Sequence, residues 1–135
     1  MGHKKDCSDL ALLRRLTADE RARIETEYDR FTKRDPESLW QESEMPEKAW
    51  LRLLGYDHEQ IDSLQYPVTQ FMQPPQCLRE SSVIANFRKL LIKAHPDKNR
   101  GSDVSSECHT EWTARLVAAK EIALLQFTCV PVEHT

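Results

Sequence analysis

The sequence predicts an all-α protein, and three features of the chain support this prediction. It contains only three glycines, it has no alternating run of apolar and polar residues, and it lacks the Asn-Gly and Asp-Gly pairs that mark tight hairpins. Leu, Ala, Glu, Lys and Arg dominate instead. With 135 residues and 39% hydrophobic content, the chain can bury one modest core, so we expect one domain with elaborations rather than two independent folds.

Residues 1–44 are predicted to form an N-terminal helical extension. Ser8 is placed to cap a short first helix, and Thr17 and Glu20 form a capping-box pair ahead of a second helix that reaches about Lys33. The apolar positions of these two helices are Leu10, Leu13, Leu16, Ile24, Tyr28 and Phe31. The Asp-Pro pair that follows ends the second helix, because proline disfavours a helical conformation in the residue before it. The residues after this break are expected to form a connector or a short helical turn.

Residues 45–126 are predicted to form the core domain, and residues 127–135 an irregular tail. Pro46 suits the first turn of a short helix, and Gly55 suits its C-terminal cap. Between about 56 and 77 the chain has an insertion that three prolines interrupt, with one helical turn near 59–64. The insertion is expected to pack against the domain because it carries apolar residues, namely Tyr66, Val68, Phe71 and Met72.

Two longer helices are predicted in the core domain. From Arg79 to Ala94, apolar residues recur at spacings of three and four, while basic residues lie off that stripe. The apolar positions are Val83, Ile84, Phe87, Leu90, Leu91 and Ala94, and the basic ones are Arg88, Lys89 and Lys93. The last helix, within 110–126, places Trp112, Leu116, Ala119 and either Ile122 or Ala123 on a packing face. For Trp50, Leu54, Trp112 and Leu116 we expect core packing.

Charge is distributed unevenly along the chain, although the formal net charge is only −3. Residues 79–100 carry six basic against two acidic side chains, whereas residues 1–78 carry 11 against 15 and residues 101–135 carry two against five. A locally basic element in an acidic protein indicates an acidic partner surface more than nucleic acid, which favours a broadly basic domain. A solvated helix face is the alternative that charge alone leaves open.

The four cysteines Cys7, Cys77, Cys108 and Cys129 form no C-x-x-C pair. We therefore expect reduced, structural thiols and a cytoplasmic or other reducing compartment. His109 stands next to Cys108, with His58, His95 and Cys77 elsewhere in the chain, but these residues lack the ligand spacing of a metal site, so no metal or cofactor is expected. No apolar run approaches the ~20 residues that span a bilayer. The N-terminus lacks the apolar stretch of a signal peptide, and Asp6 stands where a myristoylation signal requires Ser or Thr.

The sequence His95-Pro96-Asp97 stops the basic helix. Pro96 has no amide hydrogen and favours an extended conformation at His95, so the chain must turn there. The turn displays an imidazole and a carboxylate beside the basic face, and a carboxylate matches the fork of an arginine on another molecule. Lys98 and Arg100 add positive charge, as ligands or as solvated charges.

The segment Phe87–Asn99 resembles the J-domain of the DnaJ co-chaperones. Phe87-Arg88-Lys89-Leu90 matches the family's aromatic-basic-basic-leucine pattern, Lys93 matches its second basic site, and residues 95–99 match its His-Pro-Asp loop. Less closely, residues 50–56 resemble its short first helix and residues 113–124 its third. The resemblance implies a helical hairpin of the second and third helices, crossed by the first, here with a long insertion before the second helix. The chain has neither a Gly/Phe-rich segment nor a zinc module, which is typical of the minimal J-proteins.

The resemblance also implies a partner, the seventy-kilodalton heat-shock chaperone, whose ATP hydrolysis J-domains stimulate without being enzymes themselves. Asp97 would engage an arginine of the chaperone, and the basic helix would meet its acidic surface. For Phe87, periodicity favours the core and the resemblance favours a chaperone contact, towards which we lean. The predicted chaperone-binding residues are Phe87, Arg88, Lys89, Lys93, His95, Pro96, Asp97, Lys98, Asn99 and Arg100.

Several features of the sequence depart from the family pattern and leave alternatives open. The insertion is longer than the family's usual loop, and Lys120 stands where tyrosine is common. A J-like scaffold that holds a client or assembly partner through its N-terminal extension or insertion, without stimulating ATP hydrolysis, is therefore the main alternative. An enzyme using His95 and Asp97 lacks a placed nucleophile, a nucleic-acid binder lacks a motif, and the tripeptide can also serve only as a helix stop.

Overall fold

The structure is a computed structural model, and it describes residues 7–33, 47–101 and 104–131 of the chain. Its elements in chain order are η1 (Ala11–Leu13), α1 (Ala18–Lys33), α2 (Ala49–Leu53), α3 (His58–Asp62), α4 (Glu80–Ala94), η3 (Pro96–Lys98), α5 (Ser106–Ile122) and the π-helical turn η4 (Ala123–Phe127). Within those ranges the only β-type pairing is an isolated bridge between Leu78 and Thr128. The predicted all-α class is confirmed.

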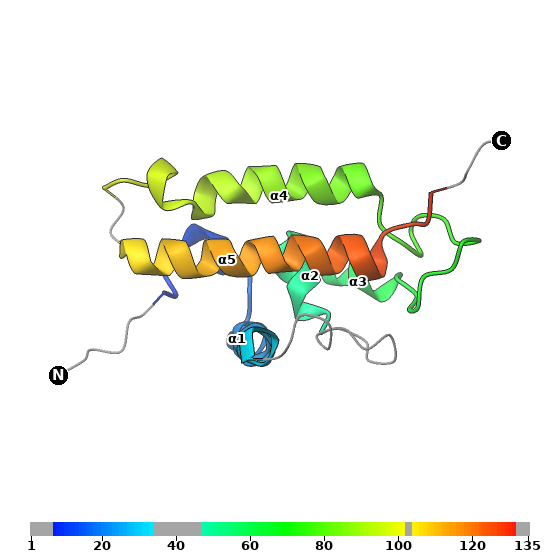
Figure 1. Cartoon of the computed structure of the whole chain (residues 1–135), viewed down its shortest axis with the longest axis horizontal. Helices are drawn as coiled ribbons and strands as arrows, with labels where there is room; N and C mark the ends of the chain where they lie inside the picture. The colour runs from blue at the N-terminus through cyan, green and yellow to red at the C-terminus, as the bar shows by residue number, and fades with distance from the viewer. Residues whose placement is uncertain (1–6, 34–46, 102–103, 132–135) are drawn as a thin grey trace.

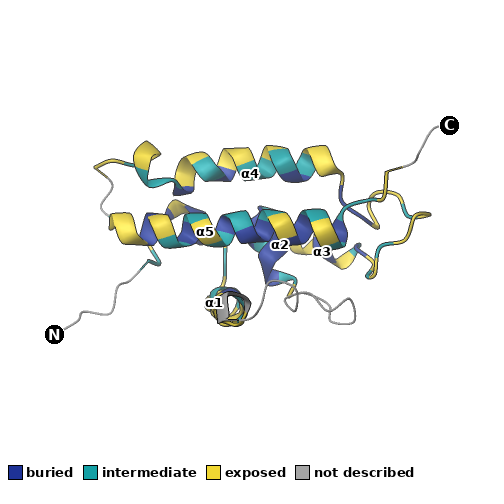
Figure 2. Cartoon of the chain, in the orientation of Figure 1, coloured by how far each residue is buried: buried dark blue, intermediate teal, exposed yellow. Residues whose placement is uncertain are grey.

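The two longest core helices, α4 and α5, lie side by side and antiparallel, with the turn η3 at one end of the pair (Figure 1). Helices α1 and α2 contact each other, and α2 also packs against α5. The buried residues line the faces where these helices meet, while the outer faces of α4 and α5 are exposed (Figure 2). The largest fully buried side chains include Trp50, Trp112 and Phe127.

Side-chain caps determine where several helices begin. The Thr17 hydroxyl accepts from the Glu20 backbone N–H at 3.0 Å, and Glu20 Oε1 accepts from the Thr17 backbone N–H at 2.9 Å, which confirms the predicted capping box of α1. Asp57 and Gln60 form a second capping box at α3. Ser105 caps α5. The helix begins four residues before the predicted start, because the apolar pattern behind the prediction does not include the first turn that Ser105 caps.

Gly55 ends α2 in a left-handed conformation, with φ +89°. The Arg15 guanidinium donates to the Gly55 carbonyl at 2.8 Å, and the Arg52 guanidinium donates back to the Arg15 carbonyl at 2.8 Å. The segment before α1 is therefore hydrogen-bonded to the end of α2. The predictions for Phe31, the Asp35-Pro36 break, the connector after it and Pro46 lie outside the described side chains or residues.

The N-terminal segment contributes to the core rather than standing apart from it. Leu10, Leu12 and Leu13 are buried, and η1 packs against α4. In α1, Ile24 is fully buried. The Arg115 guanidinium of α5 lies 4.8 Å from the centre of the Tyr28 ring of α1 and 5.0 Å from the Trp112 ring, so it joins the two helices by cation–π contacts.

One expectation from the sequence is wrong, and a second is met only in part. The four thiols are not reduced: Cys7 pairs with Cys108 and Cys77 with Cys129. Local spacing could not show these pairs, because the partners are 101 and 52 residues apart and meet only in the folded chain. The insertion packs only in part, since Tyr66 contacts the core but Phe71 is 83% exposed.

Candidate functional site

The His-Pro-Asp segment forms the turn that joins α4 to the loop before α5. The backbone leaves the helix at His95, with φ −65° and ψ 130°, and Pro96 begins the 3-10 turn η3. The Asp97 backbone N–H donates to His95 Nδ1 at 3.1 Å. Because Nδ1 is the acceptor, the neutral imidazole carries its hydrogen on Nε2. We call residues 95–99 the tip.

The Asn99 side chain faces the helix rather than a partner. Its amide donates to the carbonyl of Ile92 at 3.0 Å and to that of His95 at 2.7 Å. The last carbonyls of an α-helix receive no hydrogen bond from an N–H of the same helix. The Asn99 amide supplies such a bond to Ile92 in the last turn of α4 and to His95 just after it. Asn99, which the sequence placed among the chaperone-binding residues, therefore holds the tip in shape.

The Asp97 carboxylate is accessible from solvent. Its side chain is 72% exposed, and its nearest ion-pair partner, the Arg100 guanidinium, lies 3.9 Å away and is 84% exposed. An ion pair of this length between exposed groups contributes little, so a better-placed arginine on another molecule can replace Arg100 at small cost. Lys98 next to them is also exposed, and Pro96 is half-buried.

The outer face of α4 leads from the tip as a basic surface. Arg88, Lys89 and Lys93 are all exposed, and Ile92 between them is 61% exposed. Phe87 is half-buried and packs against the core, while the Lys120 ammonium of α5 lies 4.6 Å from the centre of its ring. The core reading of Phe87 is thus met in part, and its contact with a chaperone stays a prediction.

His109 is a candidate residue that sequence reasoning missed. It is only 4% exposed, and its Nδ1 lies 2.9 Å from the carbonyl oxygen of Ala94, the last residue of α4. In the sequence, His109 was considered only as a metal ligand, beside Cys108. Its buried position on the first turn of α5 follows from the Ser105 cap, and this cap was the signal that could have located it.

A second polar cluster lies where α1, α2 and α3 meet, along a pocket of about 320 Å³. Arg52 Nε donates to the Glu20 carboxylate at 3.1 Å, and His58 lies 3.9 Å from the same carboxylate. Burial acts to raise the pKa of Glu20, but the Thr17 N–H and the Arg52 charge outweigh burial and lower that pKa. For Glu27, burial prevails and raises the pKa, despite the hydrogen bond from the Glu47 backbone.

The described residues hold no group of three or more His, Cys, Asp or Glu side chains that could bind a metal ion. In the same part of the chain, none of the helices is both long enough and apolar enough to cross a membrane. Comparisons with protein-family models, with curated proteins and with solved structures gave no match. Function must therefore be inferred from the residues and their geometry.

Proposed function

We propose that this protein is a J-domain co-chaperone that binds a seventy-kilodalton heat-shock chaperone and stimulates its ATP hydrolysis. The observation that carries the proposal is the accessible Asp97 carboxylate at the end of a basic helix face. This arrangement suits a partner that offers an arginine beside an acidic surface. The resemblance of residues 87–99 to the J-domain signature supplies the identity of that partner.

In this proposal each part of the site has a separate role. Asp97 accepts a bidentate hydrogen bond from an arginine of the chaperone, which is stronger than a bond between neutral groups. The basic residues of α4 attract the acidic surface, so association should be faster at low salt. His95 is half-buried and shapes the turn through Nδ1, which accepts from the Asp97 N–H. The ATP-hydrolysing chemistry belongs to the chaperone and not to this chain.

The two disulfides bear on the compartment. Stable disulfides form in oxidising compartments and are rare where glutathione and thioredoxin keep thiols reduced. All four cysteines of this chain are paired. We therefore favour a chaperone that resides in an oxidising compartment, in place of the reducing compartment that the cysteine spacing suggested.

The exposed Phe71 supports a second candidate function, the J-like scaffold. A phenylalanine that is 83% exposed on the insertion offers an apolar anchor to a client or assembly partner. In this alternative the partner binds through the insertion, and stimulation of a chaperone is absent. The two candidates differ in whether changes at the tip affect function.

The test is single-turnover ATP hydrolysis by chaperones from reducing and oxidising compartments, with and without this protein. We expect stimulation by at least one of them, and we expect His95→Gln and Asp97→Asn each to return the rate to near the unassisted value. The matched control is Asp62→Asn, because Asp62 is an exposed aspartate of α3, outside the tip. Circular dichroism should show that all variants are folded.

Two results would contradict the proposal. If stimulation survives both tip changes, the tip is not the contact. If the unaltered protein stimulates no chaperone while it captures an assembly partner through Phe71, the scaffold is the better account.

A further inference from the structure

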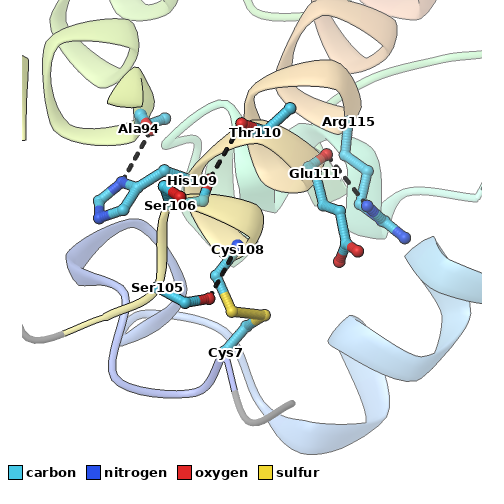
Figure 3. Close-up of a disulfide and its surroundings, with 9 residues drawn as sticks. All are labelled: Cys7, Ala94, Ser105, Ser106, Cys108, His109, Thr110, Glu111 and Arg115. Atoms are coloured by element: carbon cyan, nitrogen blue, oxygen red, sulfur yellow. Dashed lines mark hydrogen bonds between the residues drawn. A yellow bond between two sulfur atoms is a disulfide. The ribbon is translucent and has the colours of Figure 1, made fainter. Parts of the chain in front are cut away.

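The first turn of α5 lies against the C-terminal end of α4, directly behind the tip. Figure 3 shows His109 pointing from α5 to the backbone of Ala94, while Cys108 next to it is joined to Cys7. Ala94 immediately precedes His95, where the tip begins. The contact from α5 therefore reaches the residue on which the tip is mounted.

The chemistry of the contact is determined by its acceptor. A backbone carbonyl cannot donate, so the hydrogen of this bond is on His109 Nδ1. The carbonyl of Ala94 is one of the terminal carbonyls of α4, which have no partner within the helix. Because His109 is 4% exposed, water cannot readily replace the bond if it is removed.

The position of His109 is fixed by its neighbours. The Ser105 hydroxyl accepts from the Cys108 backbone N–H at 3.3 Å, which holds the first turn of α5. The disulfide from Cys108 leads to Cys7, and the segment that follows Cys7 packs onto α4 through η1. Helix α4 thus contacts both α5 and the N-terminal segment, and the disulfide joins these two elements near His109.

We propose that His109 is a positioning residue for the tip, and that the Cys7–Cys108 disulfide keeps it in place. The role of the tip in chaperone stimulation rests on the function proposed above, but its positioning by His109 does not. The charged side chains of the tip, Asp97 and Lys98, are exposed, so the structure supports the tip from behind, through the backbone carbonyl of Ala94. The disulfide at the other end of the helix pair has no part in this support.

The first experiment compares His109→Leu with His109→Asn. Leucine fills a similar volume without a donor, whereas the Asn amide nitrogen stands close to the position of Nδ1 and can still donate. Hydrogen exchange measured by mass spectrometry should show roughly three- to tenfold faster exchange at residues 95–99 in the Leu variant, with the rest of α4 and α5 unchanged. The Asn variant should restore slow exchange.

The second experiment removes each disulfide in turn. Cys7→Ala with Cys108→Ala should speed exchange at the tip, whereas Cys77→Ala with Cys129→Ala should leave the tip unchanged. If exchange at the tip is unaltered in the Leu variant, or if it rises equally along both helices, His109 is only a packing residue and the inference is wrong. Equal effects of the two disulfides on the tip would also refute it.

Stimulation of the chaperone separates this inference from the proposed function. A positioning role predicts that His109→Leu lowers the maximal stimulation of ATP hydrolysis. The concentration of this protein that gives half-maximal stimulation should change less. His109→Asn should restore both values. If the unaltered protein does not stimulate any chaperone, the proposed function fails, yet the exchange measurements still decide whether His109 positions the tip.

Discussion

The two ends of the α4–α5 pair are built in opposite ways. At one end, the tip exposes charged side chains and is held by hydrogen bonds to backbone groups of α4. At the other end, the chain from Ser63 to Leu78 has no charged residue and is fastened by Cys77–Cys129 and by the bridge between Leu78 and Thr128. Figure 1 shows these two ends at opposite sides of the molecule.

The difference shows how a small helical domain can keep one surface available. A recognition surface must leave its side chains accessible, so it can be stabilised only through its backbone and its inner face. The uncharged loop is under no such constraint, and side chains close it: Cys77 is bonded to Cys129, and the Tyr66 hydroxyl donates to Gln126 at 3.2 Å. Each end is therefore fastened by a disulfide, but the tip end also keeps charged side chains accessible.

The largest expected effect comes from the disulfides. Chain entropy predicts a loss of roughly 4 to 5 kcal/mol for removing Cys7–Cys108, which are 101 residues apart, and about 4 kcal/mol for removing Cys77–Cys129, which are 52 apart. Urea unfolding of the two paired alanine variants measures both losses. A clearly larger loss at the loop end would show that the tip end is not the more strongly constrained of the two.

A smaller effect is expected at Asn99. Replacing it with alanine removes two hydrogen bonds, to the carbonyl of Ile92 in α4 and to that of His95 just after it, and we expect a loss of about 1 to 2 kcal/mol in the free energy of unfolding. The matched change at the loop end is Tyr66→Phe, which removes one half-buried bond and should cost about 1 kcal/mol or less. Equal losses in the same urea titration would mean that Asn99 is not a main support of the tip.

The smallest effect is expected at Phe71. Because this side chain is 83% exposed, Phe71→Ser should change the free energy of unfolding by less than about 0.5 kcal/mol. Thermal unfolding of the variant provides the measurement. A loss of several kcal/mol would show that Phe71 is buried in solution and would weaken the scaffold alternative.

The helices were predictable because their signals are local. The Thr17–Glu20 box, the periodicity of α4 and Gly55 at the end of α2 each lie within a few residues of the feature that they determine. The predicted core residues Trp50, Leu54, Trp112 and Leu116 are all buried, and both candidates Ile122 and Ala123 lie in the core. The start of α5 was missed because its cap precedes a polar turn, not an apolar run.

The candidate site was predictable only in its exposed part. His95 and Asp97 form a local motif, but the partner of Ala94 is 15 residues away, and the disulfide that holds it spans most of the chain. Such contacts depend on which helices pack together, and no short pattern encodes this.

The Cys7–Cys108 bond also limits how the protein can mature during synthesis. At translation rates of about 5 to 20 residues per second, Cys7 waits on the order of 5 to 20 seconds before Cys108 is made. During that interval the thiol of Cys7 can react only with Cys77 or with other molecules. Correct pairing therefore requires either a Cys7 thiol that stays unreacted until Cys108 has been made or an isomerase that corrects an early bond.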